Sequence, residues 1–157
     1  MQQESLILIE DTRNKVGCHA NVANYCERHG IQIVRQKLDY GDYMLQQNPF
    51  LSVDTKQDLQ EVATNLMNRS DSARFWREIR GATSSKVHLI ILVEEHGISS
   101  VRDVYKWQSK WNRVNGRMLM DEMIRCEMAY NVQWEFCDKR STGKRLIELL
   151  TGERDAS

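Results

Sequence analysis

The sequence has little that would place the chain in a membrane or a secretory pathway. No apolar run reaches the roughly 18 residues that a membrane-spanning helix needs. The first residues, Met-Gln-Gln-Glu-Ser, lack the basic start and the apolar stretch of a signal peptide. We therefore expect an intracellular protein without a membrane partner, cytoplasmic if it is bacterial or from a phage and nuclear if it is eukaryotic.

Cysteine is sparse, and the cysteines that are present form no disulfide framework. The chain of 157 residues has four of them, Cys18, Cys26, Cys126 and Cys137, with no CxxC pair. Reduced thiols are therefore the expectation. Cys18, Cys26 and His29 could meet on one helix, but a zinc site there lacks a fourth ligand at suitable spacing.

An excess of either charge is missing as well. Lysine and arginine together number 22, aspartate and glutamate together number 22, and the net charge is zero. Dedicated nucleic-acid binders usually carry a basic excess, so this balance predicts a modest intrinsic affinity for DNA. A nuclease is still compatible with it, because an enzyme that gathers carboxylates around a metal ion offsets its own basic surface.

No linker, internal repeat or low-complexity segment divides the chain, which predicts one domain over residues 1–150 and a polar tail over 151–157. Apolar periodicity predicts the order β-α-β-β-β-α-β-α-β-α, a single α/β domain with helices flanking a mixed central sheet. Asp71 is the expected N-cap of the helix that follows it. The expected strands are 5–10, 31–37, 40–43, 52–56, 87–93 and 133–137. The expected helical regions are 16–29, 59–67 with a second helical piece at 71–82, 117–130, and 142–150.

A hairpin carries the most informative residues. Its strands, Tyr40–Tyr43 and Ser52–Lys56, flank a Gln-Gln-Asn-Pro turn. Because side chains two apart in a strand point to the same face, Asp54 and Lys56 are expected to lie together, with Asp42 across the turn. Two carboxylates and a lysine suit a divalent cation beside a water that attacks a phosphodiester. The alternative is a half-exposed hairpin with ordinary polar residues on its wet face.

Three motifs in order extend this constellation. They are Asp11-Thr12-Arg13 at the end of the first expected strand, Gly41-Asp42-Tyr43, and Asp54-Thr55-Lys56 followed by Asp58-Leu59. They resemble the D-x-R-E, G-D-Y and E-R-K-x-x-x-D pattern of the XPF-type structure-specific endonucleases, which belong to the PD-(D/E)xK restriction-endonuclease-like superfamily. The resemblance covers nearly the whole domain, most clearly residues 6–94.

This resemblance implies a restriction-endonuclease-like fold and a metal-dependent DNA endonuclease that hydrolyses phosphodiester bonds with Mg²⁺ or Mn²⁺. Branched or flapped duplex DNA, as found in DNA repair and recombination, is the implied substrate. Family members usually cut as dimers and carry helix-hairpin-helix repeats, which this sequence does not show. A homodimer or a helper DNA-binding protein is therefore expected to position it. The rival interpretation is a non-catalytic scaffold of the same fold that binds DNA or a nuclease partner.

The site residues of the family carry over by position. Asp42 would be the principal metal ligand, Asp54 the second ligand in place of a glutamate, and the main-chain carbonyl of Thr55 the third. Lys56 would orient the attacking water and offset charge on the phosphate, and Asp11 would support the metal ion or its water shell. The four side chains among these, Asp11, Asp42, Asp54 and Lys56, form the implied catalytic set.

Two positions depart from the family pattern. Asn14 stands where the family has the glutamate of D-x-R-E, and Thr55 stands where it has the arginine of E-R-K.

Arg13 would bind a phosphate or orient a carboxylate, and the arginines after the third motif would either contact the DNA backbone or form a solvated helix face. The predicted DNA-binding residues are Arg13, Lys15, Arg69, Arg74 and Arg77.

A second basic group lies later in the chain. Within residues 99–113 and just beyond, basic side chains recur with helical spacing beside apolar ones, which predicts one helix with a basic stripe next to an aromatic stripe. Such a helix would be a DNA-facing lid or, as is more common, a helix that buries its tryptophans. The basic residues are Lys106, Lys110 and Arg113, and their neighbours are Trp107, Trp111 and Val114.

Overall fold

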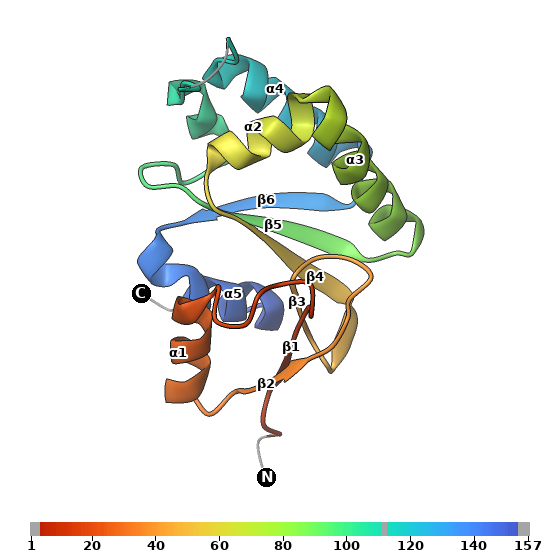
Figure 1. Ribbon diagram of the computed structural model, residues 1–157, viewed down its shortest axis with the longest axis vertical. Helices are drawn as coiled ribbons and strands as arrows, with labels where there is room; N and C mark the ends of the chain where they lie inside the picture. Colours follow the sequence, from red (N-terminus) through yellow and green to blue (C-terminus); the bar gives the residue numbers. More distant parts are fainter. Residues whose placement is uncertain (1–3, 111–112, 154–157) are drawn as a thin grey trace.

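The computed structural model describes residues 4–110 and 113–153, and it shows a six-stranded mixed sheet with helices on both faces (Figure 1). The strands are β1 (Ile7–Glu10), β2 (Gln32–Arg35), β3 (Tyr43–Leu45), β4 (Asn48–Lys56), β5 (His88–Glu94) and β6 (Val132–Cys137). Their order in the sheet is β2-β1-β3-β4-β5-β6. Strand β3 runs antiparallel to its neighbours β1 and β4, and the remaining neighbours pair in parallel.

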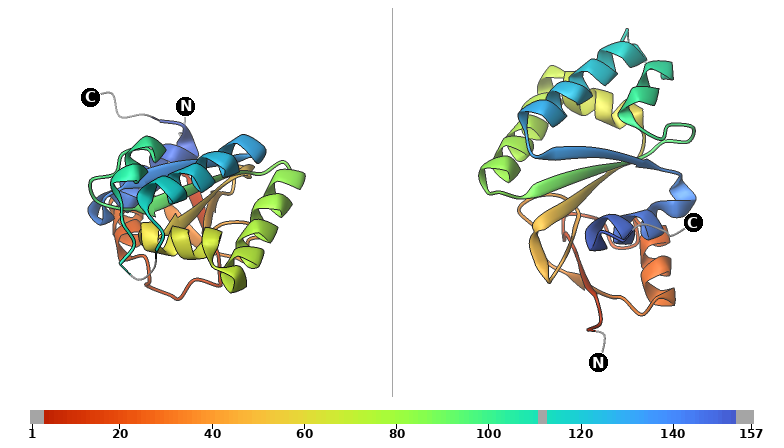
Figure 2. Two further views of the ribbon diagram at one scale, coloured as in Figure 1. Left: turned by 90° about the horizontal axis from the view of Figure 1, so that it is seen from above. Right: turned by 180° about the vertical axis from the view of Figure 1, so that it is seen from behind.

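Helices cover the two faces of this sheet (Figure 2). One face carries α1 (Ala20–Arg28) and α5 (Thr142–Thr151), and the other carries α2 (Leu59–Met67), α3 (Arg69–Ser84) and α4 (Gly116–Ala129). Two short 3-10 helices, η1 (Val101–Lys106) and η2 (Lys139–Ser141), lie in the connections. Within the described ranges no helix has both the length and the apolar character that crossing a membrane would require. The predicted α/β domain with a mixed central sheet is confirmed.

Strand β5 shows why both faces of the sheet are covered. All of its residues from 89 to 93 are buried. Since successive side chains of a strand point to opposite faces, its odd-numbered residues pack with α2, α3 and α4, and its even-numbered residues pack with α1 and α5. The continuous apolar run therefore forms a central strand, as predicted, because neither face of it meets water.

Both ends of the chain differ in detail from the expected elements. The helix expected over 16–29 begins only at Ala20. Gly17 adopts a left-handed φ of 80°, and the Val16 side chain is 82% exposed, so this stretch lacks the packing that would hold it helical. Helix α5 continues to Thr151, the first residue of the expected tail, and residues 154–157 of that tail lie outside the described part of the chain.

Two local expectations about caps and turns are wrong. Helix α3 is capped by Asn68 and not by Asp71, because the side-chain oxygen of Asn68 accepts a hydrogen bond from the backbone N–H of Ser70 at 3.0 Å. Pro49 belongs to β4 and not to the turn, because that strand already begins at Asn48. The register between β3 and β4 shifts near this end, where a missing N–H is tolerated.

The single helix expected to carry Lys106, Lys110 and Arg113 is also wrong. After η1 the backbone of Trp107 is extended, with φ −79° and ψ 151°, and Gln108 forms an isolated β-bridge with Asn115. The chain returns so closely that a Cβ on Gly116 would lie 2.2 Å from a carbonyl oxygen of η1. The basic and aromatic stripes therefore do not share one helix. Trp107 packs partly buried against the core, and Trp111 lies outside the described residues.

Candidate active site

The hairpin of β3 and β4 brings Asp42 and Asp54 to the same place. Gly41, with a φ of 77°, turns the chain toward β3, and the backbone N–H of Asp42 donates to the Val53 carbonyl at 2.8 Å. The backbone N–H and the hydroxyl of Thr55 both donate to Asp42 Oδ2, at 2.9 and 2.7 Å. These contacts orient the Asp42 carboxylate, while its Oδ1 receives no hydrogen bond from the described residues.

Asp54 and Lys56 share one face of β4, as the two-residue spacing predicts. Lys56 Nζ lies 3.0 Å from Asp54 Oδ2, and the two side chains are only 12% and 11% exposed. The same ammonium lies 4.0 Å from Glu61 Oε1 on α2 and 5.5 Å from the centre of the Phe75 ring on α3. The lysine is thus held between the strand and two helices, with its charge directed at carboxylates.

Burial and charge shift the pKa values of this group. Burial raises the pKa of Asp54 to about 6, and the nearby Asp42 carboxylate adds to this effect against the opposing charge of Lys56. Burial lowers the pKa of Lys56, but the carboxylates of Asp54, Glu61 and Asp42 outweigh it and leave that pKa above its ordinary value. The site therefore combines a protonated lysine with carboxylates that repel one another, which is an environment that favours a bound cation.

Asp11 is buried at the end of β1, and both of its carboxylate oxygens are engaged. The Leu38 backbone N–H donates to Oδ1 at 3.0 Å, and Arg13 Nε donates to Oδ2 at 2.6 Å. Arg13 also donates to the Leu38 carbonyl at 2.8 Å, and the Asp11 backbone N–H donates to the Asp42 carbonyl at 2.8 Å. Asp11 and Arg13 thus tie the end of β1 to the loop that carries Asp42. Of the two contacts predicted for Arg13, the structure contains the one to a carboxylate.

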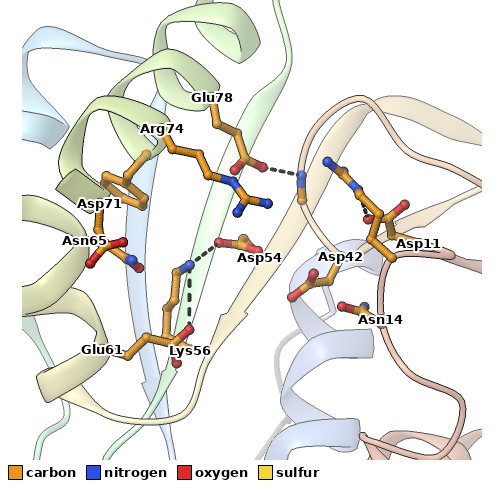
Figure 3. A pocket seen from close by; sticks show the side chains of 13 residues that line it. Asp11, Asn14, Asp42, Asp54, Lys56, Glu61, Asn65, Asp71, Arg74 and Glu78 are labelled. Carbon is orange, nitrogen blue, oxygen red and sulfur yellow. Dashed lines mark hydrogen bonds and ion pairs between the residues drawn. The ribbon is translucent and has the colours of Figure 1, made fainter.

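Two adjoining cavities, of about 340 Å³ and 630 Å³, meet at the Asp42, Asp54 and Lys56 centre and form one cleft. The first cavity extends toward α3, where the Arg74 guanidinium points into it (Figure 3). The second extends from the same centre toward the segment between β1 and α1, and Lys139 of η2 also lines it. The carboxylates therefore lie in the middle of the cleft, with cations on both sides.

The structure separates the predicted DNA-binding residues into two groups. Arg13 and Arg74 line the first cavity, and Arg13 and Lys15 line the second. Arg69 and Arg77 are exposed on α3 but line neither cavity. Arg74 forms no hydrogen bond or ion pair with the residues that the structure describes, so its charge is available to a ligand. The arginine cluster of the sequence is thus not one surface.

Sequence reasoning missed several polar residues of the cleft. Glu78 Oε1 accepts a hydrogen bond from the Gly41 backbone N–H at 2.9 Å, and burial, with the nearby Asp54 charge, raises the Glu78 pKa. Asp71, Arg74 and Glu78 are spaced i, i+3 and i+7, so a helical period would have grouped them. No local signal marks Lys139, which only the tertiary structure brings to the cleft. The missed residues include Glu61, Asn65, Asp71, Glu78 and Lys139.

The donor atoms of the cleft fit a magnesium or manganese ion. No three Asp, Glu, His or Cys side chains cluster as a ready metal site within the described ranges. Mg²⁺ however keeps several waters and is usually held by one or two carboxylates. Asp42 and Asp54 each present a carboxylate oxygen that no described donor contacts, and the buried Oδ1 of Asn65 in the same cavity lacks a partner there. Asn14 Nδ2, equally buried and unpartnered, is a donor suited to a phosphate oxygen.

The fold is similar to solved structures of XPF. The XPF from Aeropyrum pernix matches with a TM-score of 0.68 at 18% sequence identity, over 94% of this chain and 66% of that chain. The same protein in complex with DNA matches with a TM-score of 0.69 at 18% identity, over 97% of this chain and 68% of that chain. This chain spans about two thirds of that XPF and has the XPF-type nuclease fold that the motifs predict. No protein-family model and no curated protein matches the sequence.

Proposed function

We propose that the protein is a divalent-metal-dependent endonuclease that hydrolyses phosphodiester bonds in DNA. The observation that carries this proposal is the meeting of Asp42, Asp54 and Lys56 in one open cleft, with the Lys56 ammonium 3.0 Å from Asp54 and free carboxylate oxygens beside it. The XPF-type fold supports the proposal, and the solved XPF complex with DNA supports DNA as the ligand. A purely structural ion pair would not need a second aspartate and an unpaired arginine beside it.

Each residue has a proposed role in the hydrolysis. Asp42 and Asp54 would hold Mg²⁺ or Mn²⁺, with the carbonyl of Thr55 as a third ligand. When bound, the ion would supply Lewis-acid stabilisation of charge on the phosphate and lower the pKa of a coordinated water. Lys56 would orient the attacking water, and Arg74 would bind a non-bridging phosphate oxygen. In-line attack of the water oxygen on phosphorus breaks the bond to the 3′ oxygen and leaves a 5′-phosphate and a 3′-hydroxyl.

For the substrate we propose branched or flapped duplex DNA, by likeness to the XPF-type enzymes. The cations of the cleft are few and the net charge of the chain is zero, so the site alone supports only modest affinity. A second copy of the chain or a helper DNA-binding protein would then hold the duplex. Such a substrate would place the protein in DNA repair or recombination inside the cell.

Incubation with labelled flap, fork and linear duplex DNA tests the proposed activity. With Mg²⁺ or Mn²⁺ we expect cleavage of the flap and the fork, and with EDTA we expect none, because the carboxylates act through the metal ion. Cleavage that persists in EDTA would contradict the proposal. Metal-independent binding to every substrate without any cleavage would favour the non-catalytic scaffold of the same fold.

Arg74→Ala is expected to weaken DNA binding about three- to tenfold and to reduce the salt slope of the affinity by about one, because it removes one phosphate contact. Fluorescence anisotropy with Ca²⁺ in place of Mg²⁺ measures binding without turnover. Arg77→Ala is the matched control, since Arg77 is exposed on the same helix but lines neither cavity. Equal losses in the two variants would show that the helix surface, and not the cleft, binds DNA.

A further inference from the structure

Glu78 reaches from α3 to the turn that carries Asp42. Its Oε1 accepts a hydrogen bond from the Gly41 backbone N–H at 2.9 Å, and its side chain lies on the wall of the first cavity (Figure 3). Gly41 immediately precedes Asp42, so this contact acts one peptide away from the carboxylate that we propose as the principal metal ligand. A shift of that peptide would move the carboxylate with it.

The turn itself leaves little room for another arrangement. Gly41 has a φ of 77°, and a Cβ there would lie 2.3 Å from Ser52 Oγ, so the position requires glycine. Ser52 Oγ donates to the carbonyl oxygens of Tyr40 and Tyr43, at 2.6 and 3.1 Å. These bonds hold the turn against the sheet. The Glu78 bond holds it from the other side, because it comes from α3.

Helix α3 touches this turn at a second point. The Tyr40 ring packs against Gly81, where a Cβ would lie 2.8 Å from the ring, and the Tyr40 hydroxyl lies 3.2 Å from Ser85 Oγ. Arg74 is one helical turn before Glu78. Because α3 is a continuous helix, its docking on the turn also sets where the Arg74 guanidinium stands relative to Asp42.

We propose that Glu78 is a positioning residue of this site. It holds Asp42 in its metal-binding orientation through the Gly41 N–H, and it fixes the position of the turn relative to Arg74. This inference rests on the proposed function and assigns Glu78 no direct contact with the metal ion. The geometry supports this indirect role, because the Glu78 oxygen that accepts the Gly41 bond is engaged with the backbone that carries Asp42.

A comparison of Glu78→Gln with Glu78→Ala tests the proposal, since both remove the charge and only the glutamine keeps an acceptor for the Gly41 N–H. At saturating Mg²⁺ we expect the glutamine variant to cleave flap DNA within about threefold of wild type and the alanine variant to lose about tenfold or more in kcat. Calorimetric titration with Mn²⁺ is expected to show about tenfold weaker binding for the alanine variant than for the glutamine variant.

Glu122→Ala is the matched control, because Glu122 lies on α4, lines neither cavity and pairs with Arg125 at 2.9 Å. All variants are assayed well below their unfolding temperatures, so a loss of folded protein is not mistaken for a loss of positioning. Equal kcat and Mn²⁺ affinity in the two Glu78 variants would overturn the positioning role, whether both match wild type or both fall. A wild-type protein that binds no Mn²⁺ and cuts no DNA would overturn the proposed function itself.

Discussion

Asp42→Asn is expected to lower cleavage of flap DNA by on the order of 10³-fold or more while the protein stays folded. Asparagine has the same shape, and its side-chain oxygen can accept the two Thr55 hydrogen bonds that Asp42 Oδ2 receives at 2.9 and 2.7 Å. The substitution removes the negative charge and replaces the second carboxylate oxygen, which faces the cleft, with an amide nitrogen that cannot bind a cation. Single-turnover cleavage over a range of Mg²⁺ concentrations measures the loss.

Stability measurements separate this loss from misfolding. Because the Asp42 charge helps to raise the pKa of Asp54, a neutral side chain at 42 relieves repulsion in the metal-free protein. We therefore expect urea unfolding of this variant at or above the wild-type midpoint. Asp39→Asn, at an exposed position on the same loop, is the control and should cleave at the wild-type rate. Wild-type cleavage by Asp42→Asn would rule out Asp42 as a ligand.

Lys56→Met is expected to lower kcat by on the order of 10²- to 10³-fold without weakening the binding of Mn²⁺. Methionine keeps an apolar stem against Phe75 but removes the ammonium that lies 3.0 Å from Asp54 and 4.0 Å from Glu61. With a positive charge removed from the carboxylates, a cation should bind at least as tightly. Calorimetry with Mn²⁺ and single-turnover cleavage, measured on the same sample, reveal these opposite changes.

The same substitution is expected to destabilise the metal-free protein by on the order of 2 kcal/mol, because it leaves the largely buried Asp54 carboxylate without its partner. Mg²⁺ should restore part of this stability, so thermal unfolding is measured with and without it. Lys37→Met, at an exposed position, is the control for loss of a lysine charge. A fall in Mn²⁺ affinity as large as the fall in kcat would contradict a role for Lys56 in the chemical step.

The centre of the site could be predicted because its residues are close in sequence and share a strand. Asp54 and Lys56 are two apart, so the strand period alone places them on one face, and their ion pair confirms it. Asp42 is linked to them by a short hairpin. The apolar run of β5 likewise predicts a central strand, since a strand buried on both faces needs apolar residues throughout.

Predictions from the spacing of side chains were wrong where the path of the backbone determined the structure. The spacing of Lys106, Trp107 and Lys110 suits a helix, yet the chain turns back after η1 and its backbone becomes extended at Trp107. The same limit applies to the arginines of α3. Arg74 and Arg77 lie one helical turn apart, and the sequence gives no reason to prefer one of them as a DNA contact. The docking of the helix on the Tyr40–Gly41 turn points Arg74 into the cleft and leaves Arg77 outside it.

The apolar patterns of the strands and the hairpin motif were enough to indicate the fold and the centre of the proposed metal site, because both depend on residues that are neighbours along one strand or across one turn. The walls of the cleft depend on contacts between distant segments. Glu78 meets Gly41, Arg13 meets Leu38, and Lys139 reaches the cleft from the far end of the chain. Such contacts follow from how helices pack on the sheet, and packing is decided by the whole core and not by any local spacing.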